Sequence, residues 1–191
     1  MKDIMKITLN LVVIFVASGV ILAVVFANTA PRIAKIKVEE QEKALKLLMP
    51  DAASIPKAGD WTTPEGKHAE FFTAKDAQGG DMGYIASTFG KGYSSYIKML
   101  VALNKDMTIK QINVLDHAET PGLGDEIEQA YFQDRFKGKT LEQLEVIKQP
   151  DPNKIEAISG ATISSRAVTK GIKTGVEMLK ERYMSNANEG K

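Results

Sequence analysis

One uncharged apolar stretch near the amino end constrains the fold of this chain more than any other feature. Residues 7–27 contain no Asp, Glu, Lys or Arg, and most of them are Val, Ile, Leu, Ala or Phe. A helix of that length spans roughly 30 Å, the thickness of the hydrocarbon core of a bilayer. The sequence therefore predicts a single-pass transmembrane anchor over residues 1–30.

A cleaved signal peptide is the alternative interpretation of this stretch. Residues 27–30 are small enough for a cleavage site, but the apolar core of a signal peptide is usually only about 7–15 residues long. We therefore expect a retained anchor. The charge count does not fix its orientation, because two lysines precede the stretch and three basic residues follow it: Arg32, Lys35 and Lys37.

Composition excludes several classes of function. The chain of 191 residues has a formal net charge of +1 and no Lys/Arg cluster interleaved with aromatic residues, so nucleic-acid binding is not expected. It has no cysteine, which excludes disulfides, iron–sulfur clusters, thiolate zinc sites and Cys-x-x-Cys-His haem attachment. With His68 and His117 as the only histidines, we predict no metal site. Electrons, if this chain transfers them, require an organic cofactor.

The apolar periodicity beyond the anchor predicts an α+β fold with a mainly antiparallel sheet and flanking helices. A short helix capped by Thr140 and a long helix from about residue 163 follow the sheet. Two hairpins are expected, from the strands Ala69–Ala74, Met82–Ser87, Tyr96–Leu103 and Thr108–Leu115.

These elements give a predicted division of the chain. Residues 31–66 are expected to form a linker helix, over residues 36–49, and then a loop from Pro56 to Gly66. One domain follows over residues 67–184, and residues 185–191 are expected to form a frayed tail.

Two stretches within the domain are rich in residues that allow a ligand to approach the backbone. The first runs from His117 to Asp125 and contains Glu-Thr-Pro-Gly-Leu-Gly, with Asp125 as the expected N-cap of a helix. The second runs from Ile155 to Arg166 and contains Ser-Gly-Ala-Thr. On residue types alone, the first is a strand-to-helix turn and Thr162 is a helix cap. A phosphate attached at Thr162 would lie beside unpaired backbone N–H groups of the helix start.

The Ser-Gly-Ala-Thr stretch resembles the flavinylation motif of FMN-binding subunits. These subunits belong to the Rnf-type ferredoxin–NAD oxidoreductases and to the related sodium-pumping NADH–quinone oxidoreductases. The resemblance implies that Thr162 carries FMN through a phosphoester, attached by a flavin transferase. Glu156 stands where that family usually has Asp. The Glu-Thr-Pro-Gly-Leu-Gly stretch after His117 resembles the family's second motif, which lies against the flavin.

The resemblance extends over nearly the whole chain, and the short length favours the Rnf-type G subunit. It implies an electron relay with no catalytic residues of its own, in a complex with other membrane subunits, with its large domain outside the cytoplasm. Two alternatives stay open: the flavin subunit of a sodium-pumping NADH–quinone reductase, and an anchored binding or assembly module without a cofactor. The predicted FMN-binding residues are Thr162, Ser159, Gly160, Ala161, Glu156, His117, Glu119, Thr120, Gly122 and Leu123.

Overall fold

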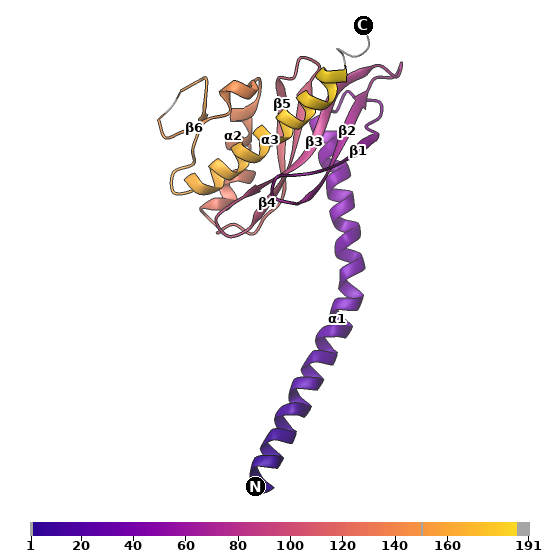
Figure 1. The fold of residues 1–191 in the computed structure, drawn as a ribbon, viewed down its shortest axis with the longest axis vertical. Coiled ribbons are helices and arrows are strands. Elements are labelled where there is room, and N and C mark those ends of the chain that lie inside the picture. The colour runs from indigo at the N-terminus through magenta and orange to yellow at the C-terminus, as the bar shows by residue number, and fades with distance from the viewer. Residues whose placement is uncertain (1, 150, 187–191) are drawn as a thin grey trace. The chain divides into compact units, whose positions relative to one another are not determined.

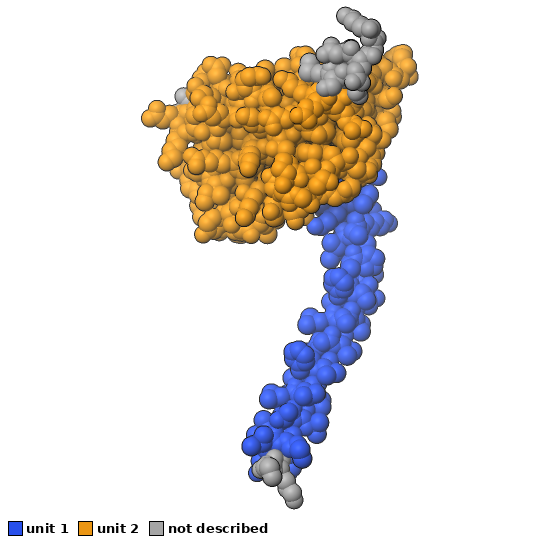
Figure 2. Space-filling model, in the orientation of Figure 1, with its two compact units in different colours: residues 1–42 blue, residues 43–191 orange. Residues whose placement is uncertain are grey.

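The computed structural model describes residues 2–149 and 151–186, and residues 187–191 of the predicted tail lie outside this part of the chain. The chain divides into two compact units, residues 1–42 and residues 43–191 (Figure 2). The first unit consists of a single helical stretch. The second holds a sheet and the remaining helices.

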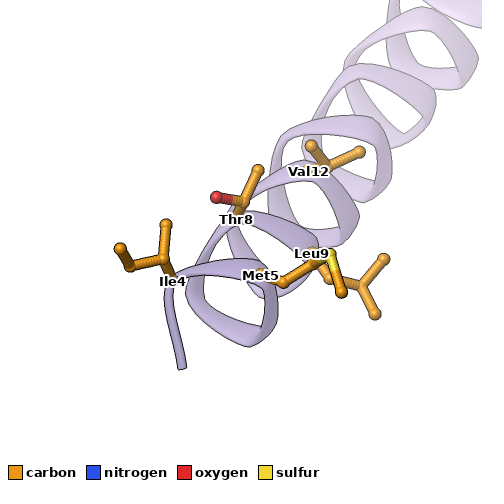
Figure 3. Close-up of a pocket in the computed structure, with 5 residues that line it drawn as sticks. All are labelled: Ile4, Met5, Thr8, Leu9 and Val12. Atoms are coloured by element: carbon orange, nitrogen blue, oxygen red, sulfur yellow. The ribbon is translucent and has the colours of Figure 1, made fainter. Parts of the chain in front are cut away.

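The first helix, α1, spans Lys2–Leu48 and continues through Pro31 (Figure 1). It contains an apolar stretch that is long enough to cross a membrane, and the side chains of that stretch are exposed. Figure 3 shows side chains of the first turns around a shallow hollow whose lining belongs entirely to α1: Ile4, Met5, Thr8, Leu9 and Val12. Its exposed apolar side chains are suited to contact with lipid tails, and a helix also satisfies its own backbone hydrogen bonds there.

The separate linker helix expected over residues 36–49 is not observed, because α1 runs unbroken to Leu48. Proline removes one backbone hydrogen bond and often kinks or ends a helix. Here α1 continues through Pro31, and the strong helix formers Ala30 and Ala34 lie on either side of it. The helix ends before Pro50, as predicted.

The main sheet confirms the predicted α+β class. Its five strands are antiparallel in the order β1-β2-β3-β4-β5, and both predicted hairpins are present. The strands are β1 Lys57–Thr62, β2 His68–Lys75, β3 Asp81–Lys91, β4 Tyr96–Asn104 and β5 Ile109–Asp116.

The prediction of a loop from Pro56 to Gly66 is wrong, because the strand β1 lies within these residues. This strand is short, mostly exposed and paired with β2 alone. Its Lys, Gly and Asp residues do not favour a strand, and pairing with β2 overrides that local preference.

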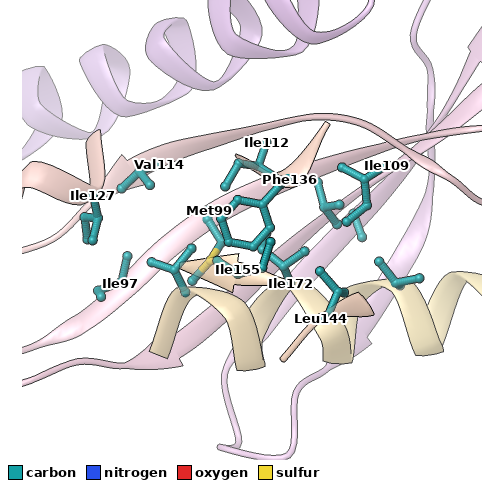
Figure 4. Packing of buried hydrophobic residues seen from close by; sticks show 14 of the residues in the cluster. Ile97, Met99, Ile109, Ile112, Val114, Ile127, Phe136, Leu144, Ile155 and Ile172 are labelled. Carbon is teal, nitrogen blue, oxygen red and sulfur yellow. The ribbon is translucent and has the colours of Figure 1, made fainter. Parts of the chain in front are cut away.

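Alternate residues of the sheet pack against two different helices. On one face, Met99 and Val101 pack in the larger core with α3, Thr162–Asn186 (Figure 4). On the other face, Leu100 packs in a second core with Leu45 and Leu48 from the end of α1. Each fully buried Leu, Met or Val side chain contributes about 1.5–3 kcal/mol to folding. α3 reaches Asn186, two residues into the predicted tail.

The backbone of α3 lies directly against β3. The hydroxyl of Thr88 donates a hydrogen bond of 2.8 Å to the carbonyl of Gly171. A Cβ atom on Gly171 would lie 2.8 Å from the carbonyl oxygen of Phe89, and one on Gly90 would overlap the carbonyl of Ala167. Residues without a Cβ therefore set how closely the helix approaches the sheet.

Short segments connect β5 to α3. They are the 3₁₀ helix η1 Gly124–Glu128, α2 Ala130–Gln133, the 3₁₀ helices η2 Asp134–Phe136 and η3 Leu141–Gln143, and the parallel pair β6 Val146–Ile147 and β7 Ile155–Glu156.

The predicted Thr140 cap is confirmed, since Thr140 and Gln143 form a capping box. The predicted Asp125 cap is wrong, because η1 begins at Gly124. The N–H of Asp125 already bonds the Thr120 carbonyl at 3.4 Å, which draws Asp125 into the helical turn.

We expect Gly90→Ala to lower the free energy of unfolding by about 1–3 kcal/mol, because the added methyl group has to push α3 away from β3. Urea unfolding of the full chain in detergent measures this change. Lys91→Ala, at an exposed position one residue further on, should change the free energy by less than about 0.5 kcal/mol. Equal stability of the Gly90 variant and the natural chain would contradict the close approach.

Candidate functional site

The chain turns sharply before α3, at Gly160. This glycine has a φ of 78°, a left-handed conformation that other residues rarely adopt. The carbonyl of Ala161 accepts the first helical hydrogen bond, from the Ser165 N–H at 3.0 Å, so Thr162 is the first residue inside the helix. The N–H groups of a first helical turn have no partner within their own helix, so this end of α3 is suited to an anion.

The Thr162 side chain does not cap the helix. Among the residues that the structure describes, its hydroxyl makes no hydrogen bond, and it is half-buried rather than enclosed. The interpretation of Thr162 as a helix cap therefore lacks the bond that defines a cap.

The neighbouring serines differ from Thr162 in their surroundings. Ser165 is buried, accepts the N–H of Ile158 at 3.0 Å and donates to the carbonyl of Ala161 at 2.9 Å. Ser164 is 2% exposed and donates to Glu119 at 2.5 Å. Ser159 is exposed. Of these four hydroxyl residues, only Ser159 and Thr162 are accessible.

Glu119 joins three segments of the site. Its Oε1 accepts the N–H groups of Ser94 and Ser95 at 3.0 and 3.1 Å, in the turn between β3 and β4. Its Oε2 accepts the N–H of Tyr93 at 3.1 Å and the hydroxyl of Ser164 on α3. Desolvation by burial would raise the pKa of Glu119, but the hydrogen bonds from Ser164 and from the turn outweigh it, so the pKa lies below its usual value.

The turn after Glu119 is compact. The carbonyl of Thr120 accepts the N–H of Leu123 at 3.2 Å, and Gly122 has a φ of 74°. A Cβ atom on Gly124 would lie 2.8 Å from the Glu119 Cβ and 2.9 Å from the Ser164 hydroxyl. The glycine at this position thus allows the turn to close onto α3.

Two hollows meet at Gly160 and Thr162, which border both. The smaller has a volume of about 360 Å³, and its lining includes Tyr93, Glu119, Thr120, Leu123, Ala161 and Ile163. The larger has a volume of about 670 Å³, and its lining includes Gly122, Glu126, Tyr131, Arg135, Lys148, Glu156 and Ser159.

Nine of the ten predicted site residues line these hollows; His117 is the exception. Its Nδ1 accepts the N–H of Glu119 at 3.1 Å, and its Nε2 lies 2.8 Å from a carboxylate oxygen of Glu128 without forming an aligned hydrogen bond. Its side chain is 8% exposed. His117 therefore stabilises the backbone of the turn without lining either hollow.

Three contributors to the site carry no signal in the sequence. Arg135 donates to the backbone carbonyl of Glu156, and its guanidinium lies 3.8 Å from the Glu156 carboxylate. Ser164 and Tyr93 hold Glu119 from segments far away in the chain. Only the fold brings these residues together, so residue spacing does not reveal them.

Three side chains of metal-ligand type lie together away from this site, on β1 and β2. Asp60, His68 and Glu70 place ligand atoms within 4.8 Å of one another. The ammonium group of Lys57 already pairs with Asp60 and with Glu70, at 2.7 Å each. A cation would have to displace this lysine.

Comparison with known proteins decides the family. A model of the FMN-binding domain family matches residues 92–177. The G subunit of the proton-translocating ferredoxin:NAD(+) oxidoreductase complex of Clostridium ljungdahlii is 35% identical over 184 residues, which cover 93% of this chain and 92% of that protein. The chain belongs to this family of G subunits.

A further relative and a solved structure accompany this match. The G subunit of the ion-translocating oxidoreductase complex of Methanosarcina acetivorans is 30% identical, and the match covers 93% of this chain and 95% of that protein. The crystal structure of Shewanella oneidensis NqrC is 28% identical, with a TM-score of 0.49, and covers 69% of this chain and 73% of NqrC. The two G-subunit relatives confirm the predicted family, and the matched FMN-binding domain includes both turns of the site.

The lowered pKa of Glu119 predicts how stability depends on pH. Ionised Glu119 stabilises the fold above its unfolded pKa of 4.5, and this contribution is lost as the pH falls through the lower folded value. Glu119→Gln should therefore be less stable than the natural chain near pH 7, and the difference should shrink below about pH 4.5. Urea unfolding of both proteins at several pH values measures it.

Glu177→Gln is the matched control for this prediction. Glu177 is exposed on α3 and makes no hydrogen bond or ion pair among the described residues. Its replacement should leave the pH dependence unchanged. A stability difference for Glu119→Gln that stays constant from neutral to acid pH would show that Glu119 does not cause the loss of stability at acid pH.

Proposed function

We propose that this protein is a membrane-anchored flavoprotein subunit that relays electrons within an ion-translocating ferredoxin–NAD oxidoreductase complex. Its FMN is bound covalently, through a phosphoester to Thr162. One observation carries the proposal: Thr162 presents a half-buried hydroxyl, without a hydrogen bond among the described residues, at the start of α3 and at the border of both hollows.

The residues around Thr162 suit the parts of FMN. The first N–H groups of α3 suit a phosphate. Leu123, Ala161 and Ile163 give the smaller hollow an apolar lining suited to a planar ring. The larger hollow, on the other side of Thr162, is polar, with two basic and two acidic side chains in its lining: Arg135, Lys148, Glu126 and Glu156.

Accessibility favours Thr162 over its neighbours as the attachment residue. Ser164 and Ser165 are buried and their hydroxyls are hydrogen-bonded. Ser159 is exposed but precedes the turn at Gly160, outside the first helical turn. A transferase that acts on this chain would find Thr162 both reachable and next to unpaired N–H groups.

When bound, FMN supplies the acceptance and release of electrons. The chain's own residues hold and orient it. Gly122 and Gly160 shape the two turns with left-handed backbone, and Arg135 fixes the segment before Thr162 through Glu156. Both hollows open to the surface, which suits a subunit that exchanges electrons with partners.

The remaining parts of the proposal concern location and partners. α1 anchors the subunit as a single membrane span, and the domain lies outside the cytoplasm, beside other membrane subunits of the complex. A flavin transferase matures it. The alternatives are the flavin subunit of a sodium-pumping NADH–quinone reductase and a module without cofactor.

Thr162→Val keeps the side-chain volume and removes the hydroxyl. Because that hydroxyl makes no hydrogen bond among the described residues, the variant should retain its fold within about 0.5 kcal/mol. After expression with the flavin transferase, the natural chain should give a fluorescent band on a denaturing gel, and the variant should give none.

Ser159→Ala is the matched control, because it removes the other accessible hydroxyl of the motif. It should keep the fluorescent band. A band that persists in Thr162→Val, with the adduct mapped to a serine by mass spectrometry, would overturn the assignment. A natural chain without any band would favour the cofactor-free alternative.

Alkaline phosphatase fused after Lys191 should be active in cells, because this enzyme folds only outside the cytoplasm and we place the domain there. A fluorescent protein that matures in the cytoplasm, fused at the same residue, should stay dark. The reverse pair of results would reverse the proposed topology.

A further inference from the structure

Among the described residues that line the smaller hollow, Glu119 alone carries a carboxylate. The residue is 6% exposed. Its two oxygens together accept four hydrogen bonds: from the N–H groups of Tyr93, Ser94 and Ser95, and from the hydroxyl of Ser164. The geometry holds an acid at this position in a single orientation.

Hydrogen-bond donors, and no cation of the described chain, surround this carboxylate. Within residues 2–149 and 151–186, no Lys, Arg or His forms an ion pair with Glu119. The imidazole of His117 lies nearby, but it accepts the Glu119 N–H and directs its other nitrogen to Glu128. Dipoles stabilise the Glu119 charge without cancelling it, so a full negative charge remains at the wall of the hollow.

The packing leaves no room for the carboxylate to move away. A Cβ atom on Gly92 would lie 2.5 Å from Glu119 Oε1, and one on Gly124 would lie 3.0 Å from Oε2. Backbone without side chains thus approaches the carboxylate from two directions. Such a charge cannot relax when the charge of a bound group changes, which makes its field effective.

We infer that Glu119 is a fixed anion that lowers the reduction potential of the flavin bound at Thr162. This inference rests on the proposed function. Adding two electrons and fewer than two protons to the ring leaves a net negative charge on it. A carboxylate fixed at the wall of the hollow repels that charge, so the oxidised form is favoured and the reduced form is the stronger donor.

The test compares the midpoint reduction potentials of the full-length natural chain and its variants in detergent. A denaturing gel first confirms that each protein carries covalent FMN. Glu119→Gln removes the charge. It should raise the equilibrium constant for flavin reduction roughly tenfold, which raises the midpoint potential by about 30 mV for a two-electron couple. Glu119→Asp keeps a carboxylate at this position, so its potential should not rise as that of Glu119→Gln does.

Glu177→Gln is the matched control, with the same chemical change on an exposed acid of α3 that lines neither hollow. Its replacement should leave the potential almost unchanged. If Glu119→Gln carries FMN and keeps the natural potential, or if Glu177→Gln shifts it equally, the inference is overturned while covalent attachment stands.

A second variant covers the case in which Glu119→Gln does not fold. Ser164→Ala keeps the charge and removes one of the four donors that compensate it. The potential should then fall, opposite in sign to Glu119→Gln. A potential that is unchanged or raised would contradict the inference. Absence of a fluorescent band from the natural chain would instead contradict the proposed attachment.

Discussion

The close approach of α3 to β3 is the constraint on which the site depends. A helix that begins at the candidate site has to be fixed in both distance and rotation against the sheet if Thr162 is to keep its place there. Gly90 and Gly171 bring backbone against backbone, and Thr88 fixes the position with a hydrogen bond to Gly171. Because interiors are close-packed, a small displacement here would carry over to Thr162.

The site itself is held by hydrogen bonds to one acid. Glu119 connects the turn between β3 and β4, its own turn and the first turn of α3, which belong to different parts of the sequence. A buried charge stabilised only by dipoles is costly to remove from water, and the fold supplies four donors to offset that cost. The Ser164 hydroxyl is one of these donors, whereas the Thr162 hydroxyl makes no hydrogen bond among the described residues.

The sequence allowed the main features to be predicted for simple physical reasons. The apolar stretch, the alternating hairpins and the periodic helix after Ser-Gly-Ala-Thr each depend on local pattern, and each is present. β1 was missed because its residues disfavour a strand and β2 imposes the pairing. The bond from Ser164 to Glu119 joins residues 45 positions apart, and Arg135 and Glu156 are 21 apart, so neither contact leaves a local pattern.

The end of α1 belongs to the core of the domain. Ala44, Leu45, Leu48 and Met49 cover the sheet face formed by Phe72, Ile85 and Leu100. A soluble fragment cut at residue 67, the boundary expected from the sequence, would lose this cover together with β1, and would present bare aliphatic side chains to water. A fragment made for crystallisation without the apolar stretch of α1 therefore has to keep the chain from about Lys43 onward.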